Sequence, residues 1–127
     1  MADAQARLQK LSEEFTDLQK ELQDVVDSRQ RLEAQKNENL GVQKEFGKLK
    51  NDETIYKLIG PVLLEQDKTE AESTVNGRIE FIGKEISRLE KQIKDTQEKI
   101  EKKKGEIIQT QAAAAQGPPA GKQPVKA

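Results

Sequence analysis

The chain of 127 residues contains neither histidine nor cysteine. Without cysteine, disulfide bonds and thiolate metal sites are impossible, which fits a reducing compartment. Without histidine, the usual zinc sites and histidine-based acid–base catalysis are excluded. The sequence also has no glycine-rich loop of the kind that cradles phosphates. We therefore expect no enzyme activity, no cofactor and no catalytic or metal-binding residues.

Aromatic residues and long apolar runs are also scarce. Only 3% of the residues are aromatic, and no apolar run approaches the roughly 20 residues of a membrane span. The N-terminal stretch MADAQARLQK lacks the apolar core of a secretory signal, so none is expected. The net charge of −1 gives no reason to expect nucleic acid as a partner. With 33% apolar and 35% charged residues, the composition is typical of long helices that bury one stripe, or of disorder.

Proline is rare too, and its positions divide the chain. The four prolines lie at positions 61, 118, 119 and 124, so two long proline-free arms flank a central stretch. Apolar residues recur three and four positions apart in both arms, which is the heptad pattern of a coiled coil and argues against disorder. In the first arm they are Leu8, Leu11, Phe15, Leu18, Leu22, Val25 and Leu32. In the second they are Val75, Ile79, Ile82, Ile86, Leu89, Ile93, Ile100 and Ile107, interrupted by Thr96 and Lys103.

Two arms of similar length joined by a short segment are expected to fold back on each other. The pattern predicts helices over residues 5–50 and 69–114 that pair antiparallel, with the numbers of facing residues summing to about 118. Leu11 then faces the Ile107 region, Leu18 faces Ile100, and Val25 faces Ile93.

The first arm loses its apolar pattern near the middle of the chain. The positions that should face the second arm are Arg29, Lys36, Asn39 and Gln43. One interpretation is a stutter, with Leu40 and Val42 moving into the face where the helices meet. The other is that polar residues at these positions fix the register. The residue numbers of Gly41 and Gly77 also sum to 118, so the two glycines could lie opposite each other. A further hypothesis is that they allow close approach of the helices at this point, or a bend.

The central stretch TIYKLIGPVLLEQ predicts a β-hairpin over Thr54–Gln66 because it is apolar and β-branched, with Gly60-Pro61 between its halves. Asn51-Asp52 offers a stop for the first helix, and Thr69 with Glu72 a capping box for the second. The hairpin carries apolar side chains on both faces, and an isolated two-stranded sheet is marginal in water. We therefore predict an obligate oligomer in which other chains supply strands and close a β-barrel or sheet. The expected oligomer-interface residues are Ile55, Tyr56, Leu58, Ile59, Val62, Leu63 and Leu64.

Two phrases give the chain a family resemblance. SRQRLEAQKNEN in the first arm, and YKLIGPVLLEQ with the following EAESTVNGRIEFIGKEISRLE, resemble prefoldin, and specifically its β-type subunits from eukaryotes. The resemblance implies a mainly α domain over residues 1–116: a long antiparallel coiled-coil hairpin with one central β-hairpin that joins an oligomeric β-barrel. Residues 117–127, rich in Ala, Gly and Pro, match nothing in the family, and their composition predicts a disordered tail.

The resemblance also implies a function. Prefoldin is a cytoplasmic heterohexamer, so this chain is expected to have five partner subunits, two α-type and three further β-type. The complex holds unfolded actin and tubulin at its coiled-coil tips and delivers them to the cytosolic chaperonin without using a nucleotide. Here the tip residues are Leu8, Leu11, Ile107 and Ile108, although Leu8 and Leu11 could equally form the last layer of the coiled coil. The alternative function is a structural tether or spacer that holds no client.

Overall fold

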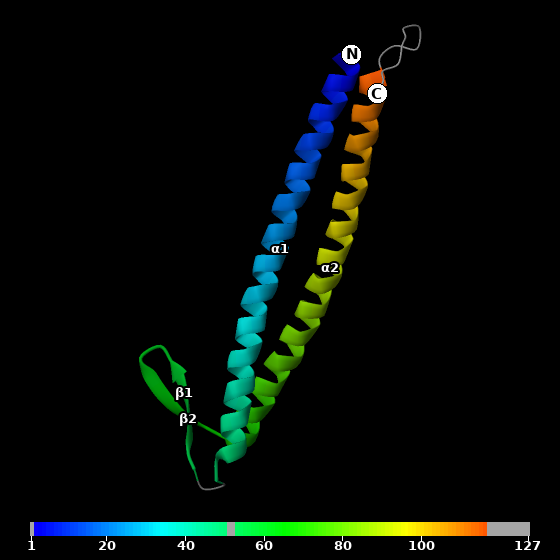
Figure 1. Cartoon of the computed structure of the whole chain (residues 1–127). Helices are drawn as coiled ribbons and strands as arrows, with labels where there is room; N and C mark the ends of the chain where they lie inside the picture. The colour runs from blue at the N-terminus through cyan, green and yellow to red at the C-terminus, as the bar shows by residue number, and fades with distance from the viewer. Residues whose placement is uncertain (1, 51–52, 117–127) are drawn as a thin grey trace. The chain divides into compact units, whose positions relative to one another are not determined.

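The computed structural model describes residues 2–50 and 53–116, and in this part the chain is mainly helical with one small sheet (Figure 1). Helix α1 spans Ala2–Lys48, strands β1 and β2 span Ile55–Ile59 and Val62–Gln66, and helix α2 spans Lys68–Gln116. The predicted fold class, two long helices around a β-hairpin, is confirmed. The helix boundaries differ by one to three residues from those expected. The predicted stop at Asn51-Asp52 and the tail 117–127 lie outside the described residues.

The chain divides into two compact units, each of which contains part of both helices. Unit 1 comprises the residues up to 26 and those from 91 onward. In it, Lys103 donates a hydrogen bond to Glu14, and Thr96 donates one to Glu21. The residue numbers of both pairs sum to 117, so the helices run antiparallel in the expected register.

The core of unit 1 contains a polar residue. Among its described residues, the buried side chains are Leu11, Val25 and Thr96, and Thr96 is only 2% exposed. The hydroxyl of Thr96 lies 3.2 Å from the Glu21 Oε2 that accepts its hydrogen bond, so this buried donor is satisfied. The position therefore interrupts the apolar stripe of the sequence but not the packing of the helices.

Unit 2 comprises residues 27–90 and includes the hairpin. Among the residues of unit 2 that the structure describes, the buried side chains all come from α2; they are Ala71, Val75, Ile82, Ile86 and Leu89. Burial of each of the larger aliphatic side chains in this group contributes roughly 1.5–3 kcal/mol. Arg29 donates to Glu90, and Gln43 donates to Asn76 at 2.7 Å. The numbers of both pairs sum to 119, which again agrees with the expected register.

The stutter interpretation of the first arm is wrong. Leu40 and Val42 are 38% and 43% exposed, so neither moves into the face where the helices meet. Instead Lys36 and Asn39 are half-buried there, as is Arg29. The physical reason is that polar side chains of α1 bond directly to α2, and the helix needs no change of phase to do so.

The glycines of this region have no packing role in the described residues. A Cβ at Gly41 or Gly77 would meet nothing within 4 Å. The hypothesis that the helices approach closely at this pair is therefore wrong, and nothing in the structure explains the two glycines.

Candidate assembly interface and client-binding tips

The hairpin is closed by a two-residue turn. Ile59 pairs with Val62, which leaves Gly60 and Pro61 as the turn residues. Gly60 has a φ of +59°, a left-handed conformation in which any side chain would be strained. The ring of Pro61 holds its own φ near −65°. A positive φ followed by a negative φ is the pattern of a type II′ turn, whose twist matches that of the flanking strands.

The register of the two strands gives each face of the hairpin its own set of side chains. One face carries the pairs Ile55–Gln66, Lys57–Leu64 and Ile59–Val62, and the other carries Tyr56–Glu65 and Leu58–Leu63. The prediction that the hairpin carries apolar side chains on both faces is confirmed. Both faces are therefore mostly apolar, with a single charged residue on each.

Most of these apolar side chains face solvent in the described chain. Ile55 is half-buried, whereas the exposed fractions of the other six expected interface residues lie between 48% and 67%. The sheet has only two strands in the part of the chain that the structure describes, so both of its outer edges carry unpaired backbone groups. Contiguous exposed apolar surface of this kind marks an interaction site.

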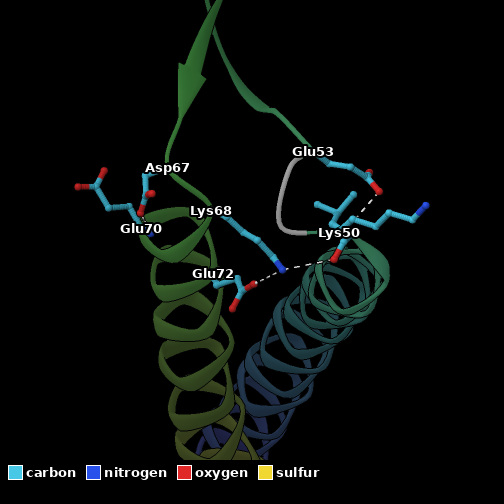
Figure 2. A network of polar contacts seen from close by, with 7 residues as sticks. Lys50, Glu53, Asp67, Lys68, Glu70 and Glu72 are labelled. Atoms are coloured by element: carbon cyan, nitrogen blue, oxygen red, sulfur yellow. Dashed lines mark hydrogen bonds and ion pairs between the residues drawn. The ribbon is translucent and has the colours of Figure 1, made fainter.

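A network of polar contacts connects the end of α1, the start of α2 and the residues that flank the hairpin (Figure 2). After α1, the backbone N–H of Lys50 donates to the Glu53 carboxylate at 3.0 Å, and the N–H of Glu53 donates to the Lys50 carbonyl at 3.1 Å. The Lys68 amine reaches the Leu49 carbonyl at 3.5 Å and lies 3.6 Å from Glu72. Lys68 thus connects the start of α2 to the carbonyl that follows α1.

The cap of α2 is not the one that the sequence suggested. The helix begins at Lys68, and the Asp67 carboxylate accepts the backbone N–H of Glu70 at 3.1 Å (Figure 2). Thr69 already lies inside the first turn, so the predicted capping box of Thr69 with Glu72 is wrong. The sequence did contain the correct signal, since Asp67 and Glu70 have the same spacing. An aspartate at the cap also places a negative charge at the positive end of the helix dipole.

The four expected tip residues differ in exposure. Leu8 and Ile107 are half-buried, and Ile108 is 57% exposed. Leu11 is only 5% exposed, which places it in the core of unit 1 and fits the alternative that it forms a layer of the coiled coil.

An ion-pair cluster in unit 1 was not anticipated from the sequence. In the sequence, Lys103 interrupts the apolar series of the second arm; in the structure, its amine lies 3.1 Å from Glu14 and 3.6 Å from Glu106. The hydrogen bond to Glu14 is the main cause that raises the pKa of Lys103 above its ordinary value, and the charges of the two carboxylates add to it. An open groove lies beside this cluster, lined mainly by charged side chains, which is unlike the apolar pocket of a small-molecule site.

The described residues offer neither a membrane-spanning helix nor a metal site. Within residues 2–50 and 53–116, no helix is long and apolar enough to cross a membrane. The same residues contain no group of three or more acidic side chains placed to hold a metal ion.

Comparison with known proteins gave concordant matches. The profile of the family described as Prefoldin subunit matches residues 9–114. Prefoldin subunit 6 of Saccharomyces cerevisiae is 43% identical over 112 residues, which cover 87% of this chain and 98% of the relative. Prefoldin subunit 6 of Homo sapiens is 38% identical over 107 residues, which cover 84% of this chain and 83% of the relative.

A solved structure is similar as well. The crystal structure of the prefoldin beta subunit from Thermococcus strain KS-1 superposes with a TM-score of 0.74 at 25% sequence identity. The superposition covers 89% of this chain and 95% of that one.

The cap of α2 yields a first prediction for this region. Asp67→Ala is expected to destabilise the start of α2 by about 1 kcal/mol, because the Glu70 N–H loses its acceptor. Amide hydrogen exchange at Glu70 measures this loss on the full chain. Thr69→Ala is the matched control and is expected to change the exchange far less. A larger effect from Thr69→Ala than from Asp67→Ala would contradict this assignment of the cap.

The Lys103 cluster yields a second prediction. Because the folded-state pKa of Lys103 is raised, its pairing stabilises the fold fully below the ordinary lysine pKa of about 10.4, and this contribution disappears as the pH rises through the folded-state value. A ¹³Cε NMR titration should place the midpoint of Lys103 above that ordinary value. Glu14→Gln should lower the midpoint of Lys103. Glu98→Gln, which lies in α2 with Lys103 but outside the cluster, should leave that midpoint unchanged. A midpoint unaffected by Glu14→Gln would show that the pair does not form in solution.

Proposed function

Because this chain belongs to the prefoldin family of chaperone cofactor subunits, which form oligomers with other prefoldin subunits, we propose that it is a β-type subunit of a cytoplasmic heterohexamer. Its partners in this proposal are two α-type and three further β-type subunits. The hexamer captures unfolded proteins such as actin and tubulin and passes them to the cytosolic chaperonin. No nucleotide and no covalent step takes part.

The exposed hairpin is the observation that carries the proposal. Six of its apolar side chains are about half exposed or more, on two faces and beside two unpaired edges. Strands supplied by neighbouring subunits satisfy the backbone groups of the edges and cover both faces in a single assembly step. We assign the assembly interface to Ile55, Tyr56, Leu58, Ile59, Val62, Leu63 and Leu64. A tether or spacer has no need of such a sheet.

Client binding is assigned to the opposite ends of the helices. Leu8, Ile107 and Ile108 supply accessible apolar surface there, with Leu11 in the adjoining core layer. A contact of this size at one subunit is weak. Several subunits on one platform raise the effective concentration of binding surfaces, and overall affinity rises without any new kind of contact. Release needs no chemical step, because weak individual contacts dissociate rapidly.

The assembly part is tested with Leu58→Asp and Leu63→Asp in the full chain, co-expressed with the other five subunits. Burying an unpaired carboxylate costs several kcal/mol, or somewhat less if the group is neutralised, so both variants should be lost from the complex. Phe81→Asp is the matched control, since Phe81 is 64% exposed but lies on α2, outside the sheet. Native mass spectrometry reports the share of hexamer that contains each chain. Normal incorporation of both hairpin variants would mean that the sheet is not the assembly surface.

The client part uses hexamers that carry Leu8→Ser together with Ile108→Ser. These hexamers should assemble normally but suppress less of the light scattering that unfolded actin produces on dilution. The loss should be partial, because five other subunits keep their own tips. Hexamers with Phe81→Ser, which removes an exposed apolar side chain elsewhere, should protect as well as the unmodified complex. Full protection by the tip variant would place client binding on another surface.

A further inference from the structure

Lys57 occupies an unusual position in the hairpin. It is the middle residue of β1, on the face that otherwise carries Ile55, Ile59, Val62, Leu64 and Gln66. Its side chain makes no hydrogen bond and no ion pair with any residue of the described ranges 2–50 and 53–116. The one carboxylate of the sheet, on Glu65, belongs to the opposite face. A neighbouring strand that covers this face must therefore accommodate the positive charge of the Lys57 amine.

The turn determines which backbone groups are free for such a neighbour. In a hairpin closed by a two-residue turn, the pair next to the turn is hydrogen-bonded, and bonded pairs alternate with non-bonded pairs along an antiparallel ladder. Ile59, Lys57 and Ile55 therefore direct their backbone groups toward β2. Tyr56 and Leu58 direct theirs outward, to the free edge of β1. An added antiparallel strand bonds to these two residues, and Lys57 lies between them in a non-bonded pair, where opposing side chains are closest.

A second copy of this chain is a poor neighbour for the β1 edge when β1 pairs with β1. The antiparallel register that pairs all five residues sets Tyr56 against Leu58 of the other copy and Lys57 against Lys57. Like charges directly opposite each other destabilise a strand pair. Registers that avoid this juxtaposition pair fewer residues of the two strands. Because β1 has only five residues, such registers retain few backbone hydrogen bonds.

Antiparallel pairing of β1 with β2 of a second copy leaves the charge unmatched. In the fullest register Tyr56 is set against Glu65 of the other copy and Lys57 against Leu64. Shifted registers set Lys57 against Val62 or Gln66 instead. The outward backbone groups of β2 belong to Leu63 and Glu65, which form the bonded pairs, so Glu65 never comes opposite Lys57 at its non-bonded position. The amine is then covered by aliphatic neighbours without a partner, which costs free energy.

We propose that the free edge of β1 accepts a strand from a different prefoldin subunit, one that carries an aspartate or glutamate opposite Lys57, and that Lys57 excludes a second copy of this chain. The proposal rests on assembly at the hairpin and specifies the chemistry of the partner on one side of it. The carboxylate forms a charge-assisted hydrogen bond with the amine on an otherwise apolar face. Lys57 thereby disfavours pairing with a second copy of this chain and favours pairing with a subunit that carries the carboxylate.

The test needs only this chain and its Lys57→Glu variant. Neither protein alone should self-associate through β1, because each sets like charges against each other. When the two are mixed, β1–β1 pairing sets the native amine against the introduced carboxylate. The mixture should associate about tenfold more tightly than either protein alone, as measured by sedimentation velocity, since the change from repelling to attracting pairs is worth a kcal/mol or more. Equal association of the mixture and the separate proteins overturns the proposal.

Two matched controls identify the edge. Mixing the native chain with Glu65→Lys should bring no gain, because full-overlap pairing of β2 with β2 sets Glu65 against Leu63 and creates no charge pair. Mixing with Lys44→Glu, an equal charge change at an exposed position of α1, should bring no gain either. A gain in either control would mean that net charge, rather than the β1 edge, drives the association.

The same variants separate this proposal from that of hexamer assembly. With the five other subunits present, Lys57→Glu should reduce incorporation several-fold and Lys57→Arg should preserve it. If the native chain incorporates and Lys57→Glu incorporates equally well, hexamer assembly stands and the role of Lys57 falls. If the native chain does not incorporate, yet its mixture with Lys57→Glu associates, the discrimination by Lys57 stands and the proposed function falls.

Discussion

The register between the two helices is the constraint on which each unit depends. Apolar residues form only a narrow stripe, and α1 contributes just two buried aliphatic side chains among its described residues, Leu11 and Val25. A shift of a few residues would set the aliphatic stripe of α2 against charged groups. Cross-helix hydrogen bonds oppose that shift in both units: Thr96 and Lys103 bond to α1 in unit 1, and Arg29 and Gln43 bond to α2 in unit 2. Partly exposed pairs such as Arg29–Glu90 add little stability, so their main effect is on which alignment is preferred.

The parts of the fold that could be predicted from the sequence are those encoded by local patterns. Heptad spacing and the position of Pro61 gave the helices, the hairpin and the antiparallel register. The polar residues of α1 could not be placed this way, because a periodicity of apolar residues says nothing about where a long side chain such as Arg29 finds its partner. The sequence left a stutter and a polar contact open, and exposed Leu40 and Val42 rule out the stutter.

The cap of α2 and the Lys103 cluster were missed for different reasons. The residues Asp67 and Thr69 both begin a motif with the spacing of a capping box, and only the position at which the backbone turns helical selects Asp67. The contact of Lys103 with Glu14 joins residues far apart in the chain, so it depends on tertiary structure. The faces of the hairpin, in contrast, were predictable because alternation within a strand is a local rule. Which of its side chains contact another subunit depends on chains outside this sequence.

The turn at Gly60-Pro61 has a consequence for the kinetics of association. Gly60 already has the positive φ that the turn requires, and the ring of Pro61 fixes the φ of the second turn residue, Pro61 itself. In the proposed assembly, the hairpin thus meets its neighbour with its conformational entropy largely lost beforehand, and ordering it adds little to the free-energy cost of the encounter. A floppy loop of the same composition would have to find its strand register while docking. In this sheet the strand register is already formed, so the orientation of the incoming strand becomes the main requirement for a productive collision.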